Sequence, residues 1–131
     1  MIISREYTTT PKLALSDMLE DAISLCKGIL TRVSVQSAPG VNGEVFIRVL
    51  HFESALLPNE PDQWIPLTGM LQNFPMHFND WNDVYYLVVQ LCAPDARFEH
   101  RINVEIEITE QETAEQIMSD FIDMGFQWQT R

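Results

Sequence analysis

The residues best suited to chemistry in this chain gather in one short stretch, 77–86, with the sequence HFNDWNDVYY. His77, Asp80 and Asp83 are residue types that bind metals, and on a helix the two aspartates would share a face. The same stretch contains two Asn-Asp dipeptides, which are typical of turns. A metal site needs three or four ligands on a rigid element, and the other histidines of the chain stand alone in the sequence. We therefore interpret this stretch as a turn that leads into a buried strand.

No catalytic motif accompanies these residues. Neither Cys26 nor Cys92 has a histidine nearby in sequence, and the chain contains no GxSxG, no HExxH and no phosphate-binding glycine loop. His51 lies on the apolar face of an expected strand, where a buried structural histidine is the usual interpretation. We therefore expect a protein that is not an enzyme and that uses no metal or other cofactor.

Charge is the most distinctive global property of the chain. It has 19 Asp and Glu residues against 8 Lys and Arg residues, which gives a formal net charge of −11. The segment 101–123 alone contains seven acidic residues and one basic residue. Such a surface repels nucleic acids and anionic membranes and attracts basic proteins. We expect a basic protein as the partner, with no direct contact to nucleic acid or membrane.

The candidate partner surface combines acidic residues near the C-terminus with aromatic residues from the middle of the chain. Its members are Glu105, Glu107, Glu112, Glu115, Asp123, Trp64, Trp81 and Tyr85. The first two should project from one face of a strand, about 6.7 Å apart at about 3.3 to 3.4 Å per residue. Buried aromatic side chains often carry much of the energy of a protein interface. The alternative is that the acids only keep the protein soluble and the aromatics belong to the core.

Length and cysteine usage describe a single domain, residues 1–131, in a reducing compartment. A chain of this length can bury a substantial core without a disulfide or a structural metal. The two cysteines lie in apolar runs without CxxC spacing, which indicates free buried thiols. The N-terminus has no signal-peptide pattern, and no window approaches the length of about 20 apolar residues that a membrane span needs. We expect a cytoplasmic protein.

Hydrophobic spacing predicts an α+β fold. Apolar residues at helical intervals predict an amphipathic helix over 14–30, and a capping box of Thr109 and Glu112 predicts a second helix at the C-terminus. Alternation predicts two β-hairpins, 31–37 with 44–52 and 84–92 with 101–109. Residues 1–9 could add an edge strand, and a short helix is expected over 66–74 within an irregular stretch, 53–83. The expected fold is an antiparallel sheet of four to five strands with N- and C-terminal amphipathic helices packed on it.

The predicted element order and the acidic pI resemble the small class I chaperones of type III secretion. That resemblance implies a homodimer that holds an extended segment of its client against the sheet through apolar surfaces. The charge favours another function, a non-enzymatic inhibitor that neutralises a basic, nucleic-acid-handling protein. Immunity proteins and anti-defence proteins that mimic DNA phosphates act in this way. The inhibitor is our leading hypothesis, and the chaperone is the alternative.

Overall fold

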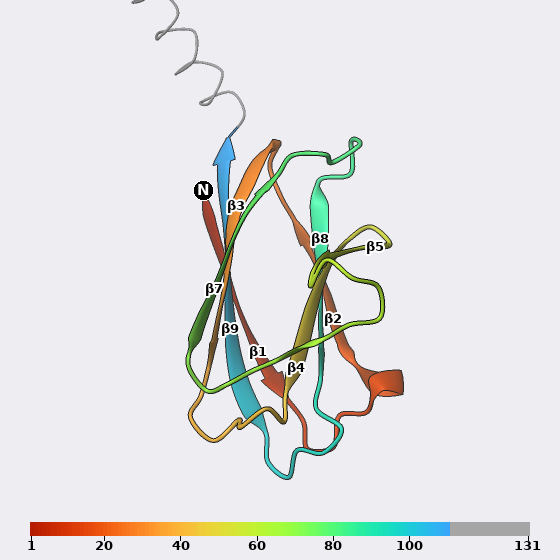
Figure 1. Cartoon of the computed structure of the whole chain (residues 1–131), viewed down its shortest axis with the longest axis vertical. Coiled ribbons are helices and arrows are strands. Elements are labelled where there is room, and N and C mark those ends of the chain that lie inside the picture. The colour runs from red at the N-terminus through yellow and green to blue at the C-terminus, as the bar shows by residue number, and fades with distance from the viewer. Residues whose placement is uncertain (111–131) are drawn as a thin grey trace, which may run out of the picture.

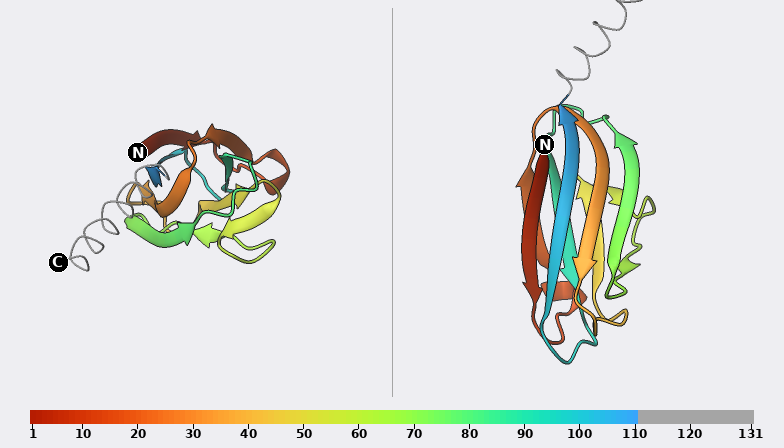
Figure 2. Two further views of the ribbon diagram at one scale, coloured as in Figure 1. Left: turned by 90° about the horizontal axis from the view of Figure 1, so that it is seen from above. Right: turned by 90° about the vertical axis from the view of Figure 1, so that its left-hand side faces the viewer.

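The computed structural model describes residues 1–110, which form two antiparallel sheets facing each other (Figure 1). The first sheet contains, in spatial order, β1 (Ile2–Thr9), β9 (His100–Glu110), β3 (Gly28–Ser37) and β7 (Leu71–Phe78). The second contains β2 (Leu19–Ser24), β8 (Tyr86–Cys92), β4 (Phe46–His51) and β5 (Ser54–Leu57). The short β6 (Ile65–Pro66) also pairs with β4, and a 3-10 helix, η1 (Leu15–Asp17), precedes β2. Figure 2 shows the two layers from above and the first sheet face-on.

The order of the strands identifies the fold as a jelly roll. Successive strands alternate between the two sheets, except that β4, β5 and β6 follow one another in the second sheet. Without the short β6, the sheets are β1-β9-β3-β7 and β2-β8-β4-β5. This is the arrangement of a jelly roll, which is a sandwich of eight strands in two Greek keys.

The core lies between the inner faces of the two sheets and follows from alternation along the strands. On β9 the side chains of Ile102, Val104, Ile106 and Ile108 are each at most 1% exposed, as their alternation with polar residues predicts. On β8 the inward side chains Leu87, Val89 and Leu91 are fully buried and face them. The strands expected over 84–92 and 101–109 are therefore confirmed as β8 and β9.

The predicted α+β class is wrong, because the described residues contain no α-helix packed on a sheet. In place of the helix expected over 14–30, the chain forms η1, β2 and the start of β3. Along β2, Leu19, Asp21 and Ile23 point inward, so a charged residue occupies one inward position and hides the alternation. The apolar residues that mimic a helical stripe are divided between η1, two strands in opposite sheets and the connections between them.

Both predicted hairpins are wrong in their pairing, although all four of their strands exist. β3 and β4 lie in different sheets, and so do β8 and β9. The Asn-Gly turn forms inside the first connection, with a hydrogen bond from the Glu44 amide to the Val41 carbonyl, but it does not join paired strands. Because connections of seven or eight residues can cross the roughly 10 Å between packed sheets, the turn residues alone do not fix the pairing.

The predictions for the ends of the chain and for its middle stretch are only partly confirmed. The edge strand expected over 1–9 is confirmed as β1. The helix expected over 66–74 is wrong, since β6 and β7 occupy this stretch. Thr109 lies within β9 and so does not start a helix, and the rest of the expected C-terminal helix falls outside residues 1–110. Within the described part of the chain, no helix is long and apolar enough to cross a membrane.

One lateral edge of the sandwich, between β1 and β2, is closed by a hydrogen bond that joins the two sheets. The Tyr7 hydroxyl on β1 donates to Oδ2 of Asp21 on β2 at 2.7 Å. Burial and this hydrogen bond raise the pKa of Tyr7 far above its ordinary value. The tyrosine therefore stays neutral in the folded protein at pH values at which an unfolded tyrosine ionises, near about pH 10.

We expect Tyr7→Phe to lower the free energy of unfolding by about 1.5 to 3 kcal/mol at pH 7, because the variant lacks a hydrogen bond to a carboxylate. The raised pKa means that this contribution is complete below about pH 10 and is lost as the pH rises above it. Urea unfolding at pH 7 and pH 10.5 should show a smaller difference between the two proteins at the higher pH. Tyr86→Phe, on the outer face of β8, is the matched control, and an equal loss in both variants would contradict the assignment.

The two cysteines are free thiols, as the sequence predicts, but they differ in accessibility. Cys26 is half-buried in the connection between β2 and β3, and Cys92 at the end of β8 is 4% exposed. Burial also raises the pKa of the Cys92 thiol, so less of the reactive thiolate forms at neutral pH.

A thiol reagent should therefore label Cys26 first in the native protein and reach Cys92 only on unfolding. Labelling with a chromogenic disulfide at pH 7.5, with and without urea, measures this order. Cys26→Ser should remove the fast phase, and a fast phase that survives in this variant would contradict the placement of Cys92.

Candidate functional site

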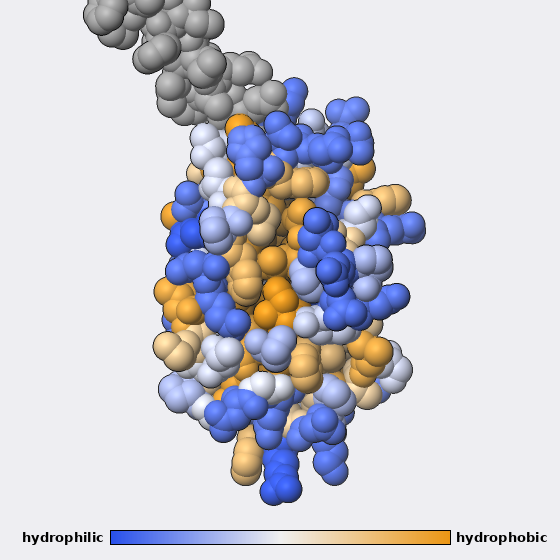
Figure 3. All heavy atoms as spheres, in the orientation of Figure 1, coloured by the Kyte–Doolittle hydropathy of each residue, from blue (hydrophilic) through white to orange (hydrophobic). Residues whose placement is uncertain are grey.

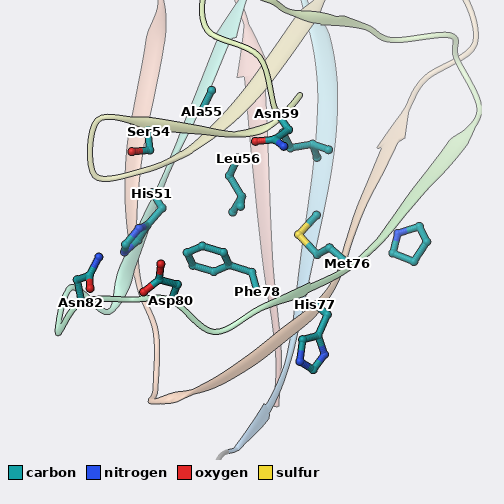
Figure 4. A pocket seen from close by; sticks show the side chains of 12 residues that line it. His51, Ser54, Ala55, Leu56, Asn59, Met76, His77, Phe78, Asp80 and Asn82 are labelled. Carbon is teal, nitrogen blue, oxygen red and sulfur yellow. The ribbon is translucent and has the colours of Figure 1, made fainter.

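A surface groove lies at the other lateral edge, between β5 and β7. It is a groove of about 550 Å³, within the range of ligand pockets. We call it the β5–β7 groove, and it is lined by His51, Ser54, Ala55, Leu56, Leu57, Asn59, Pro75, Met76, His77, Phe78, Asp80 and Asn82. Figure 3 shows apolar side chains along the middle of this edge, with hydrophilic residues on both sides. Figure 4 shows the groove from close by.

Alternation on β7 builds one wall of the groove. Met76 and Phe78 point inward and are half-buried, whereas Pro75 and His77 are exposed on the opposite side of the strand. In Figure 4 the His77 ring accordingly lies across the β7 ribbon from Met76 and Phe78. The other wall is the β4–β5 hairpin, which turns tightly at Phe52 with φ of 57°. The groove thus has an apolar floor and a polar rim.

Three aromatic rings cluster at one end of the groove, which two of them, His51 and Phe78, line. His51, at the end of β4, packs edge-on against Phe78 and Trp81, with centroid distances of 5.1 and 5.3 Å. The Phe78 and Trp81 rings are 4.8 Å apart. Trp81 is 3% exposed, and its Nε1 donates to the carbonyl oxygen of Gly28 at 2.6 Å. The cluster therefore ties the 79–85 loop to the first residue of β3.

His51 is tied to the 79–85 loop by a hydrogen bond. Its Nε2 donates to the carbonyl oxygen of Val84 at 2.8 Å, since a carbonyl oxygen can only accept. The side chain lines the groove although His51 is only 8% exposed.

A tight turn fixes Asp80 at the mouth of the groove. The Val84 amide donates to the Trp81 carbonyl at 2.9 Å, and the two central residues, Asn82 and Asp83, have φ of 51° and 63°. This is a type I′ turn, which Asn and Asp tolerate, so the turn interpretation of 77–86 is confirmed. Asp80 precedes the buried Trp81, and Figure 4 shows it at the end of the groove near His51 and Phe78.

The electrostatic environment of the groove is acidic. Residues 49–96 contain six acidic residues and no Lys or Arg. Three of these acids, Glu53, Asp80 and Asp83, lie in the loops at the His51 end of the sandwich. No Lys or Arg lines the groove, and Asp80 is the acidic residue among its lining residues. The groove is therefore suited to a positively charged ligand.

The residues predicted from the sequence for partner binding are not brought together. Glu105 and Glu107 share the outer face of the first sheet, where Arg32 Nη2 lies 3.7 and 3.1 Å from their carboxylates. Trp64 lies over the Arg48 guanidinium on the outside of the second sheet, at 4.4 Å.

The remaining members of that set are placed as follows. Trp81 is buried in the aromatic cluster, and half-buried Tyr85 lies beside it with ring centroids 6.1 Å apart. Glu112, Glu115 and Asp123 lie outside the described residues. Sequence analysis missed Asn59, Met76 and Phe78 as site residues, although the run of 48 residues without Lys or Arg, 49–96, marks their region.

The metal site considered for His77, Asp80 and Asp83 is not formed. Within residues 1–110, no group of three or more His, Cys, Asp or Glu side chains is arranged to hold a metal ion. His77 points to the other side of β7 from the inward-facing residues of the groove, which separates it from the interior. The groove offers polar groups that donate as well as accept, those of Ser54, Asn59 and Asn82, beside the Asp80 carboxylate and an apolar floor.

Trp81→Phe should lower the free energy of unfolding by about 1 to 3 kcal/mol, because it keeps an aromatic ring but leaves the Gly28 carbonyl without its donor. Urea unfolding followed by far-UV circular dichroism measures the loss. Trp64→Phe is the matched control, since Trp64 contributes only a contact with Arg48 at the surface. Similar losses in the two variants would contradict the anchoring role of Trp81.

No protein-family model, curated protein or solved structure matches this chain. The jelly-roll assignment therefore depends on strand order and register alone. Jelly rolls serve proteins as different as viral capsid subunits and lectins, so the fold does not select a function. The function has to be argued from the β5–β7 groove.

Proposed function

We propose that this protein is a non-enzymatic binding domain that captures a basic protein partner at the β5–β7 groove. The observation that carries the proposal is the groove itself, which has an apolar floor, a carboxylate on Asp80 and no Lys or Arg in its lining. The formal net charge of −11 adds long-range attraction for a basic surface.

The groove is a better candidate than the acidic face of β9. Each of the two exposed carboxylates on that face, those of Glu105 and Glu107, lies within 4 Å of the Arg32 guanidinium. Glu107 also accepts a hydrogen bond from the Thr31 hydroxyl at 3.2 Å. The positive charge of Arg32 thus offsets part of the negative charge of these two carboxylates. Asp80, the acidic residue that lines the groove, has no Lys or Arg among the other lining residues.

A basic, nucleic-acid-handling protein is the partner class that this arrangement favours. Such proteins carry clusters of Lys and Arg that bind phosphates, and an acidic surface competes for them. Binding at the groove would block those residues sterically and electrostatically, which is how an immunity-type or anti-defence inhibitor acts. The protein would then contact the nucleic-acid site of its partner without contacting nucleic acid itself.

The secretion-chaperone alternative has less support, because it depended partly on an α+β element order, which the jelly roll replaces. It uses apolar faces of the sheet to hold its client, and the inner apolar faces of the two sheets pack against each other in the core.

The test is a quantitative pull-down at low and high salt, about 50 and 500 mM, with the full chain as bait. We expect recovery of a basic nucleic-acid-handling protein at low salt and its loss at high salt. A groove variant, Asp80→Asn with Asp83→Asn, should recover less, because it removes two charges from the rim while Asn still tolerates the type I′ turn.

The matched control is Glu105→Gln with Glu107→Gln, which changes the net charge equally on the face of β9. Association rates measured with the purified partner should fall in the groove variant and change little in this control. Equal binding by all three baits at high salt would contradict the proposal. Loss of binding in the β9 variant alone would also contradict it and would place the site on the first sheet.

A further inference from the structure

We infer that the C-terminal segment, residues 111–131, docks in the β5–β7 groove of its own chain. The inference goes beyond the proposed function, because it concerns a contact within the protein and its test contains no partner. Three observations support it. The groove leaves apolar side chains open to solvent, the described part of the chain ends close to it, and the sequence of the segment contains an apolar stripe of suitable length.

The floor of the groove consists of apolar side chains that residues 1–110 only half bury. Leu56 on β5 and Met76 and Phe78 on β7 pack against the core on one side and line the groove on the other. Figure 4 shows these three side chains pointing into the same space. Covering them removes apolar surface from water, which is the dominant favourable contribution when one protein segment docks on another. The groove therefore favours an occupant with an apolar face.

The described part of the chain ends close to this floor. Glu110, the last residue of β9, pairs with Gly28 at the start of β3. The Gly28 carbonyl accepts the hydrogen bond from Trp81, whose indole packs against Phe78 in the groove lining. Because β9 and β7 flank β3 in the first sheet, about 10 Å, or two strand spacings, separates β9 from the groove edge. Three residues in an extended conformation, 111–113, span about that distance.

The sequence of the segment provides an apolar face of the length that the groove needs. On the helix that the sequence predicts here, one side carries Ala114, Ile117, Met118, Phe121 and Ile122. These nine positions, 114–122, extend about 13 Å along a helix, which is about the length of the four-residue strand β5. Glu112, Asp120 and Asp123 fall on the opposite side of that helix. Docking therefore covers the floor without placing these carboxylates against Asp80.

The docked segment affects the proposed partner site. A basic protein that binds the floor of the groove has to displace the segment first. Its apparent affinity is then lowered by the fraction of molecules in which the groove is closed. The segment thus acts as a competitor within the same chain.

The experiment compares two-dimensional amide correlation spectra of the full-length protein and two full-length variants. Ile117→Asp with Phe121→Asp places two carboxylates in the apolar stripe. Gln116→Asp with Ser119→Asp is the matched control, because it adds the same charge on the opposite side of the predicted helix. All four substitutions lie outside the described fold, so the sandwich itself is unchanged.

We expect the backbone amide resonances of Leu56, Met76 and Phe78 to shift in the stripe variant and to keep their wild-type positions in the control. The resonances of Tyr7 and Ile23, at the β1–β2 edge, should stay in place in all three proteins and so report that the sandwich is folded. Identical groove resonances in the wild type and the stripe variant would overturn the inference.

Dilution of the wild-type protein distinguishes docking within one chain from docking between two copies. Contacts within a chain do not depend on concentration, so the groove resonances should not move. Movement toward the positions of the stripe variant on dilution would assign the segment to a second copy and would overturn the inference as stated. Neither result bears on the pull-down, which tests the proposed function separately.

Discussion

The hydrogen bond from Trp81 Nε1 to the Gly28 carbonyl is the interaction on which the groove depends. It joins the 79–85 loop, which leads into β8 of the second sheet, to the start of β3 in the first sheet. The indole also provides the surface against which the rings of His51 and Phe78 pack. Because Asp80 directly precedes Trp81, anchoring the indole also places the Asp80 backbone beside the groove.

The groove exists because the two lateral edges of the sandwich differ. At the β1–β2 edge, Tyr7 and Asp21 meet in a hydrogen bond between the sheets. At the opposite edge, β5 has only four residues, and the chain then detours through 58–64 before β6 pairs with β4 again. The inward side chains of β7 consequently lack a full-length strand across from them and stay half-buried. The edge between β5 and β7 is therefore open as a groove because β5 is short.

The sequence predicts the strands of the core but neither their sheets nor the groove. Clean alternation identifies β9, and a dense run of apolar residues identifies β8. Alternation fails on β2, where inward-facing Asp21 is tolerated only because Tyr7, fourteen residues away, donates to it. The pairing fails because connections that look like hairpin turns cross between sheets. The groove combines residues 51–59 with 75–82, and no local pattern reports that the fold places them together.

The distribution of charge has different consequences for the long-range attraction of a basic protein and for its specific recognition. An excess of acids over the whole surface can steer a basic protein toward the molecule, but it cannot choose an orientation. On the face of β9, Arg32 offsets part of the field, so little distinguishes that face from an ordinary solubilising surface. At the groove, Asp80 stands beside the half-buried ring of Phe78, and no Lys or Arg lines the space. Under the proposed function, the orientation of a bound partner would therefore be set at the β5–β7 groove and not by the net charge.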